Sequence, residues 1–275
     1  MAYIRQPIVS VLGHVDHGKS SLLDQIRGTS VVAREAGGIT QHIGATEVPI
    51  EAILSICGDL VAGKSFKVPG LLFIDTPGHV AFTTLRARGG ALADLAVLVV
   101  DLNEGFRPQT VESINILRRY KTPFLVAANK IDMVPGWRKE MNVPFGVAHG
   151  NQNESVREEL DKRLYELVGS LFQNGFSAER YDRIEDFATT VAVVPTSAKH
   201  GVGIPELLLV LIGLAQRFLE ADLKVPEGPA EGTILEVKEE KGLGLTVDAI
   251  VYRGALSLGD TLVLGSAGKP IVTKV

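Results

Sequence analysis

Hydrophobic positions fall in short continuous runs, each followed within a few residues by a polar residue or glycine. The continuous runs are Leu71–Ile74, Leu95–Val100, Phe124–Ala128 and Val191–Val194, and Ile8–Leu12 is a further short β-rich run. A continuous apolar run of this length is typical of a strand buried on both faces, as in a parallel sheet. The pattern therefore predicts a mostly parallel sheet built from these segments.

Segments with helical periodicity lie between the apolar runs. Helices are expected over Lys19–Arg27, which follows a glycine-containing turn, over Glu154–Phe172 and over Glu206–Leu219. The segment Lys139–Asn153 shows no clear period. Strands that alternate with helices predict an α/β fold with a doubly wound sheet. The apolar stripe of the second helix is formed by Val156, Leu160, Leu164 and Val168.

The pattern changes near Val225–Gly228, where the sequence VPEGP is typical of a linker. Beyond it, β-type runs are separated by glycine-containing turns, and no helical pattern appears. We expect an α/β domain over residues 1–224, a linker over 225–230 and an all-β domain from 231 to 275. This last stretch is short for a closed barrel, so the chain is expected to stop inside that domain.

Composition limits the classes of protein that remain. The chain has 275 residues, 45% of them hydrophobic and 22% charged, which is typical of a globular protein rather than a disordered one. Its net charge of −4 gives no global basic field for nucleic acid. The single Cys57 cannot form an internal disulfide, and neither a signal peptide nor a membrane-spanning stretch is apparent. A cytoplasmic, monomeric protein without membrane contact is expected.

The first chemical motif lies between the first apolar run and the first predicted helix. The sequence GHVDHGKS fits the phosphate-loop pattern G-x-x-x-x-G-K-[ST]. Its glycines let backbone N–H groups curl around phosphates, and the helix that follows directs its positive end toward them. Lys19 is expected on the β- and γ-phosphates and the Ser20 hydroxyl on Mg²⁺. The phosphate-binding residues predicted here are Gly13, His14, Val15, Asp16, His17, Gly18, Lys19, Ser20 and Ser21.

Two further motifs follow apolar strands. Asp75 comes directly after Leu71–Ile74, where a carboxylate can hold Mg²⁺ through water, and Gly78 can bring its N–H against the γ-phosphate. The motif NKID follows Phe124–Ala128. A carboxylate at Asp132 can accept hydrogen bonds from N1–H and the 2-amino group of guanine, a pairing that adenine cannot offer.

The remaining guanine contacts are expected around that carboxylate. Asn129 can read the other edge of the base, and the stem of Lys130 can cover its plane. Ser197, Ala198 and Lys199 follow the strand Val191–Val194, where backbone N–H groups could meet the guanine O6. Together the motifs predict a GTP/GDP site with magnesium.

These elements, in this order, resemble the GTP-binding domain of the Ras-type superfamily, and VDHGK with DTPGH resembles the translational GTPases. The run from Gly78 to Asp94 is similar to the family of bacterial initiation factor two and archaeal and eukaryotic initiation factor five B. The segments ICGD, at Ile56–Asp59, and GWR, at Gly136–Arg138, resemble the archaeal and eukaryotic branch. The all-β segment resembles the start of that family's second domain, a β-barrel.

The resemblance implies roles for several residues. His79 would orient the attacking water, Thr40 would bind Mg²⁺ in the triphosphate state, and Gly38 would lie near the phosphates. Val15 and Ile39 match two apolar positions that shield the water from the histidine, and ordinary packing is the alternative for both.

Asp16 is an acidic residue beside the expected phosphates, which is unfavourable unless a cation offsets its charge. A potassium or sodium ion could bind there. In the alternative, Asp16 caps the loop or faces water.

The resemblance also implies a function: a slow intrinsic GTPase, stimulated by the ribosome, that promotes subunit joining in translation initiation. Contact with large-subunit RNA rests on the resemblance, and contact with initiator tRNA is expected only through downstream domains. A GTP-binding scaffold without turnover, or another tRNA-carrying translational GTPase, stays open as the alternative.

Overall fold

The computed structural model describes residues 3–32, 45–74, 93–219, 221, 223–225, 228–240, 242 and 244–275. Its contacts divide the chain into two compact units, Gln6–Ala221 and a smaller unit of Met1–Arg5 with Asp222–Val275. The domain boundaries expected from the sequence, at residues 224 and 231, stay predictions.

The larger unit contains a seven-stranded sheet with the order β3-β4-β2-β5-β6-β8-β7. The strands are β2 (Ile8–Gly13), β3 (Ala45–Pro49), β4 (Gly70–Ile74), β5 (Leu95–Asp101), β6 (Phe124–Asn129), β7 (Ala178–Arg180) and β8 (Val191–Pro195). All neighbouring pairs are parallel except β3 with β4. The five predicted strands therefore lie in the parallel part of one sheet, together with the short strand β7, which confirms the predicted fold class. The antiparallel edge strand β3 carries no continuous apolar run and was not anticipated.

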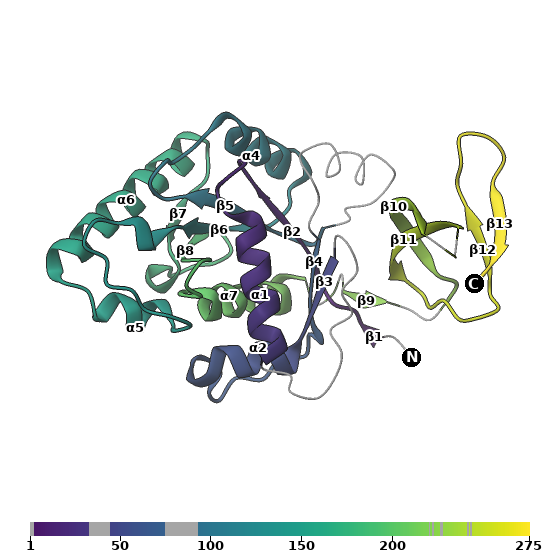
Figure 1. Ribbon diagram of the computed structural model, residues 1–275, viewed down its shortest axis with the longest axis horizontal. Helices are drawn as coiled ribbons and strands as arrows, with labels where there is room; N and C mark the ends of the chain where they lie inside the picture. Colours follow the sequence, from purple (N-terminus) through teal and green to yellow (C-terminus); the bar gives the residue numbers. More distant parts are fainter. Residues whose placement is uncertain are drawn as a thin grey trace. The chain divides into compact units, whose positions relative to one another are not determined.

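Helices cover both faces of this sheet (Figure 1). They are α1 (Lys19–Val32), α2 (Ile50–Cys57), α4 (Pro108–Tyr120), α5 (Phe145–Gly150), α6 (Glu154–Gln173) and α7 (Ile204–Phe218). Short 3₁₀ turns lie at Gly58–Val61, Ile131–Met133 and Tyr181–Arg183. The helices predicted from Lys19, over Glu154–Phe172 and from Glu206 are all present.

Side-chain alternation on the strands explains how both faces are buried. Ala96, Leu98 and Val100 of β5 point to one face, into the cluster that contains the apolar side of α4, α5 and α6. The intervening Val97 and Val99 are also fully buried. The helix α5 lies in the segment Lys139–Asn153, which showed no helical period. Only two of its residues, Phe145 and Ala148, are buried in this cluster, and two residues are too few to form a periodic pattern.

The smaller unit is all-β in its described residues. The strand β1 (Tyr3–Ile4) pairs with β9 (Lys224–Val225), β10 (Glu231–Glu240) with β11 (Gly244–Arg253), and β12 (Thr261–Leu264) with β13 (Ile271–Lys274). The Tyr3 hydroxyl donates to the Gly254 carbonyl at 2.8 Å, which ties the N-terminus to this unit. The strands β10 to β13 lie within the stretch 231–275 that was expected to be all-β, whereas β1 and β9 lie outside it.

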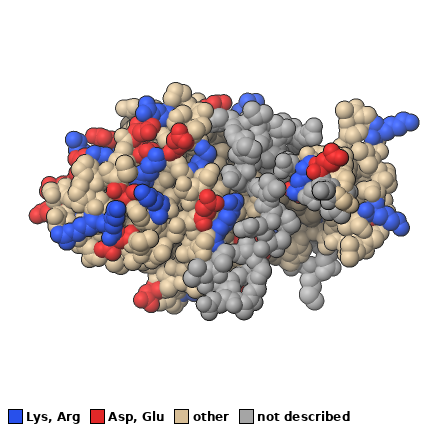
Figure 2. Space-filling view, viewed as in Figure 1, with Lys and Arg blue, Asp and Glu red and all other residues tan. Residues whose placement is uncertain are grey.

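No helix in the described parts of the chain is long and apolar enough to cross a membrane. On the visible face of the larger unit, basic and acidic side chains are interspersed (Figure 2).

Glu206, at the start of α7, is a buried carboxyl group with an incomplete set of partners. The backbone N–H of Gly146 donates to its Oε1 at 3.3 Å, and the Tyr181 hydroxyl lies 3.4 Å from the same atom. No hydrogen bond reaches Oε2 within the described region. Burial raises the pKa of Glu206, although the backbone N–H groups and Tyr181 oppose that shift.

Replacing Glu206 with glutamine should therefore stabilise the protein at alkaline pH. Because the folded-state pKa lies above the unfolded value of 4.5, ionisation of Glu206 opposes folding as the pH rises through the folded-state pKa. The variant should have a higher free energy of unfolding than the original chain at pH 8, and the difference should shrink below pH 4.5. Urea unfolding at both pH values measures it, with Glu158→Gln on the exposed side of α6 as control. A pH-independent difference would contradict the assignment.

Candidate nucleotide-binding site

The register of the sheet brings the predicted motifs to one edge. Gly13 of β2 pairs with Val99 of β5, and Asp101 pairs with Asn129 at the ends of β5 and β6. The neighbouring strand β8 ends at Pro195, just before the segment Thr196–Lys199. Because all these strands are parallel, the loops that follow them meet at the carboxyl edge, where ligands of open α/β sheets bind.

The loop between β2 and α1 requires glycine at two positions. Gly13 has φ 144° and Gly18 has φ 94°, both in the region that favours glycine. A Cβ at Gly13 would lie 2.3 Å from the carbonyl oxygen of Val99, and one at Gly18 would lie 2.4 Å from Nδ2 of Asn129. Asp16 also has a left-handed backbone, with φ 64°. At Gly13 and Gly18 the loop backbone therefore lies too close to its neighbours for any side chain to fit.

Lys19 is positioned over this loop. Its Nζ donates to the carbonyl oxygen of Gly13 at 3.0 Å and to that of His14 at 2.7 Å. The first helical bond of α1 runs from the N–H of Leu22 to the carbonyl of Gly18. The N–H groups that precede it, including those of Ser20 and Ser21, lie at the positive end of the helix dipole. This combination of an ammonium group and a helix N-terminus suits a phosphate group.

Asn129 connects the phosphate loop to the segment after β8. It is 1% exposed. Its Nδ2 donates to the carbonyl oxygen of His17 at 2.9 Å, and its Oδ1 accepts from the backbone N–H of Ala198 at 2.9 Å. The Thr196 hydroxyl lies 3.4 Å from the same Oδ1. The structure therefore shows Asn129 joining loops, whereas the sequence suggested contact with the base, which stays a prediction.

Asp132 lies beside the segment Ser197–Lys199. The Ser197 hydroxyl donates to its Oδ1 at 2.5 Å, and Nε2 of His200 lies 3.8 Å from its Oδ2. The side chain of Asp132 is 9% exposed. Ser197 thus fixes one carboxylate oxygen in place, an arrangement suited to accepting two parallel donors such as those of guanine.

Lys130 adopts a left-handed backbone and forms an ion pair across the edge. Its Nζ lies 2.8 Å from Oδ2 of Asp101, and its φ is 64°. Burial alone would raise the pKa of Asp101, but hydrogen bonds from Lys130 and Asn103 outweigh it and the pKa is lowered. Asp101 is therefore ionised at neutral pH and holds the Lys130 stem in place.

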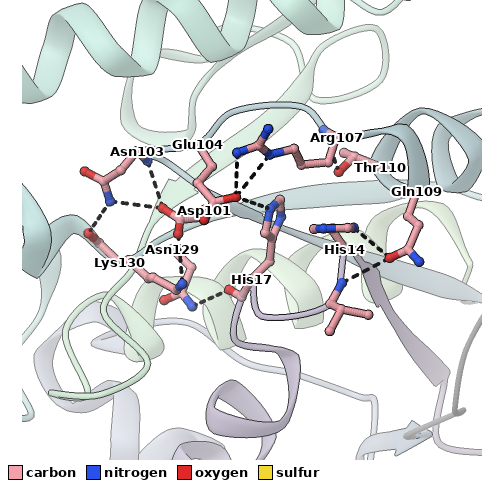
Figure 3. A network of polar contacts seen from close by, with 12 residues as sticks. His14, His17, Asp101, Asn103, Glu104, Arg107, Gln109, Thr110, Asn129 and Lys130 are labelled. Atoms are coloured by element: carbon pink, nitrogen blue, oxygen red, sulfur yellow. Dashed lines mark hydrogen bonds and ion pairs between the residues drawn. The ribbon is translucent and has the colours of Figure 1, made fainter.

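The stretch from the last residue of β5 to the first turn of α4 adds residues that the motifs did not identify: Asp101, Asn103, Glu104 and Gln109 (Figure 3). His200, which lies beside Asp132, is a further residue of the site that the motifs did not identify. Asn103 donates to Oδ1 of Asp101 and to the Lys130 carbonyl, and Gln109 contacts the phosphate loop. One signal was available for Asp101, since it follows the strand Leu95–Val100 as the other site residues follow theirs. Glu104 and Gln109 belong to no such pattern.

His17 is a residue of the phosphate loop, and its side chain is fully buried. Burial lowers its pKa, against the opposing effect of the Val99 backbone and of Asp101. Its Nε2 is 3.8 Å from Oε2 of Glu104, and its ring meets that of His14 edge to face at 5.1 Å. The lowered pKa favours a neutral imidazole, which adds no positive charge under the loop.

Several predicted residues lie outside the described part of the chain: Gly38, Ile39, Thr40, Asp75, Gly78 and His79. Among the described candidates, Val15 is 56% exposed, so its side chain is not packed into the core here. Asp16 is exposed as well. Their expected roles, as part of a gate and as a cation ligand, stay predictions.

Ser20 is the described residue that fits magnesium. Ser20 is exposed and lies in the first turn of α1, directly after Lys19, so its hydroxyl group is accessible to a metal ion. No group of three His, Cys, Asp or Glu side chains suited to a metal occurs among the residues that the structure describes. Magnesium takes oxygen ligands and fills much of its coordination with phosphate oxygens and water, so a single protein hydroxyl here is compatible with it.

Comparison with known proteins supports the interpretation of this sheet edge as a nucleotide-binding site. The family described as Elongation factor Tu GTP binding domain matches residues 5–217. A protein named probable translation initiation factor IF-2 from Methanococcoides burtonii is 62% identical over 273 residues, which cover 99% of this chain and 46% of that protein. One of the same name from Archaeoglobus fulgidus is 61% identical with the same shares. The chain spans about half the length of these curated relatives.

Two solved structures share the fold of this chain. The GDP-bound aIF5B from Aeropyrum pernix has a TM-score of 0.94 at 53% identity, over 99% of this chain and 46% of that one. Elongation factor SelB from Methanococcus maripaludis has a TM-score of 0.59 at 22% identity, over 94% and 45%, which shows a shared fold. The resemblance drawn from the motifs is thereby confirmed. This chain belongs to the family of the elongation factor Tu GTP binding domain, with archaeal translation initiation factors among its relatives.

Proposed function

We propose that this chain binds GTP with Mg²⁺ and hydrolyses it to GDP and phosphate. The observation that carries the proposal is the meeting of the phosphate loop and the NKID segment at one sheet edge, joined through Asn129. A phosphate site and a guanine site on adjacent loops can hold the two ends of one nucleotide. The GDP bound to the structural relative from Aeropyrum pernix supports the same choice of ligand.

The described residues suggest how catalysis would proceed. Lys19 now donates to two loop carbonyls, and phosphate oxygens would replace these acceptors. Its ammonium group and the α1 N-terminus would then stabilise the negative charge that develops as the terminal phosphoryl group leaves GDP. Ser20 would hold the metal, and Mg²⁺ when bound neutralises charge on the phosphate oxygens. Water attacks the γ-phosphorus, and His79, as the resemblance implies, would orient that water.

The finer role is that of a ribosome-dependent switch in translation initiation that promotes subunit joining in the cytoplasm. The names of the archaeal relatives support the part of this role that concerns translation initiation. No arginine of the described site points to a built-in charge donor, since Arg107 is engaged with Glu104 at 3.1 Å. We therefore expect slow turnover by the chain alone and stimulation of that turnover by the ribosome, as the resemblance implies. A GTP-binding scaffold without turnover remains the alternative, and a turnover measurement separates the two.

Ribosomes should raise the rate of GTP hydrolysis by this chain at least tenfold, in keeping with externally stimulated GTPases. Release of labelled phosphate, measured with and without archaeal ribosomes, tests this. His79→Ala should abolish the stimulated rate while fluorescent GTP still binds, and Lys19→Met sets the background of ribosomal contaminants. A rapid rate without ribosomes, or full stimulation of His79→Ala, would show the mechanism to be wrong. Binding without turnover in any condition would favour the scaffold.

A further inference from the structure

The helix α4 contacts the phosphate loop through one side chain. Oε1 of Gln109 accepts a hydrogen bond from the backbone N–H of Val15 at 3.1 Å and lies 2.7 Å from Nδ1 of His14 (Figure 3). Because this amide oxygen can only accept, His14 must carry its proton on Nδ1 in this contact. One oxygen atom thus joins two consecutive residues of the loop to the helix.

Gln109 is held in place on a rigid element. It lies in the first turn of α4, and the nearby Thr110 and Ser113 of this helix are fully buried. The Ser113 hydroxyl donates to the Gln109 carbonyl at 2.8 Å, and the Thr110 hydroxyl accepts from the N–H of Arg107 at 3.3 Å. Buried side chains and hydrogen bonds therefore hold the start of the helix in place, and Gln109 connects His14 and Val15 to it.

His14 and Val15 belong to the predicted phosphate-binding residues, but their contact with Gln109 uses atoms other than the N–H groups at the start of α1. The N–H groups at the start of α1, up to Ser21, precede the first helical bond to Gly18 and form the anion-binding end of the helix. The N–H of Val15 lies upstream of them and is already used by Gln109. The contact with Gln109 can therefore persist when a nucleotide occupies the site.

We propose that Gln109 is a positioning residue that orders the outer half of the phosphate loop, His14 and Val15, and thereby slows the release of bound nucleotide. The inference rests on the proposed nucleotide binding. A loop that is already ordered loses less conformational entropy on binding, so the bound state gains affinity. Without Gln109, the segment around the left-handed Asp16 loses its connection to α4 and opens more readily.

Replacing Gln109 with methionine tests the proposal, since methionine has similar length but lacks the acceptor oxygen. Dissociation of a fluorescent GDP analogue, chased with excess GDP in a stopped-flow instrument, should become roughly tenfold faster, as expected for one or two neutral hydrogen bonds. The matched control is Gln173→Met at the end of α6, which should release the analogue at the original rate. Gln173 is exposed and far along the chain from the site.

A second measurement separates positioning from a general loss of stability. In nucleotide-free protein, amide hydrogen exchange of the peptide covering residues 13–18 should rise in Gln109→Met, while exchange in α6 stays unchanged and the melting temperature falls by no more than about 5 °C. Release within twofold of the original rate, slower release, or a rise in exchange spread over the whole chain would overturn the proposal. Failure of the unmodified chain to bind the GDP analogue would instead refute the proposed function.

Discussion

Replacing Asp132 with asparagine should lower the affinity for GTP roughly a thousandfold and raise the affinity for xanthosine triphosphate. Two charge-assisted hydrogen bonds to guanine, each worth about 1.5–3 kcal/mol, would be lost. Xanthine carries an oxygen where guanine has its 2-amino group, and the asparagine amide can donate to it. Ser197 can still donate to Oδ1 of the new side chain, so the geometry of the site should be retained.

Isothermal titration with both nucleotides measures this change of specificity. Asp59→Asn, which alters an exposed carboxylate in the turn Gly58–Val61, serves as the control and should leave GTP affinity unchanged. Retained selectivity for GTP in Asp132→Asn would show that Asp132 does not contact guanine. Equal loss of both nucleotides would point to local unfolding instead, which circular dichroism of the variant would reveal.

Asn129→Ala is expected to have the second largest effect, and it should act on stability as well as on binding. The change leaves the His17 carbonyl and the Ala198 N–H without their partner in a buried place. Each unsatisfied buried group costs about 1–3 kcal/mol, so the free energy of unfolding should fall by about 2–4 kcal/mol. Affinity for GTP should fall at least tenfold, because Asn129 would no longer fix the phosphate loop and the segment after β8 in their relative positions.

Urea unfolding and nucleotide titration should be carried out on the same variant. The control is Asn151→Ala, which removes an exposed amide bonded to Glu140 at 3.0 Å and should change neither quantity measurably. If Asn129→Ala kept its stability but lost GTP, Asn129 would act mainly on the base, as the sequence alone suggested. If it kept both, the bridge between the loops would contribute nothing.

The sequence predicted most of the sheet because a strand that is buried on both faces appears in the sequence as a continuous apolar run. Leu95–Val100 and Phe124–Ala128 are continuous apolar runs, and each became a central parallel strand. The edge strand β3 left no such trace, since Glu47 and Thr46 interrupt its apolar positions. The helix α5 was missed for a related reason, as six residues are too few to display a helical period.

The site divides along the same line. The sequence by itself determined the phosphate loop and the guanine motif, because their chemistry depends on residues adjacent in the chain: the glycines around Lys19, and the carboxylate at Asp132. Only the tertiary structure decided which distant residues support them. Gln109 reaches Val15 across 94 positions, and Asn129 reaches His17 across 112. Such contacts follow from strand order and register, which place the ends of β2, β5 and β6 side by side and which no local pattern of residues specifies.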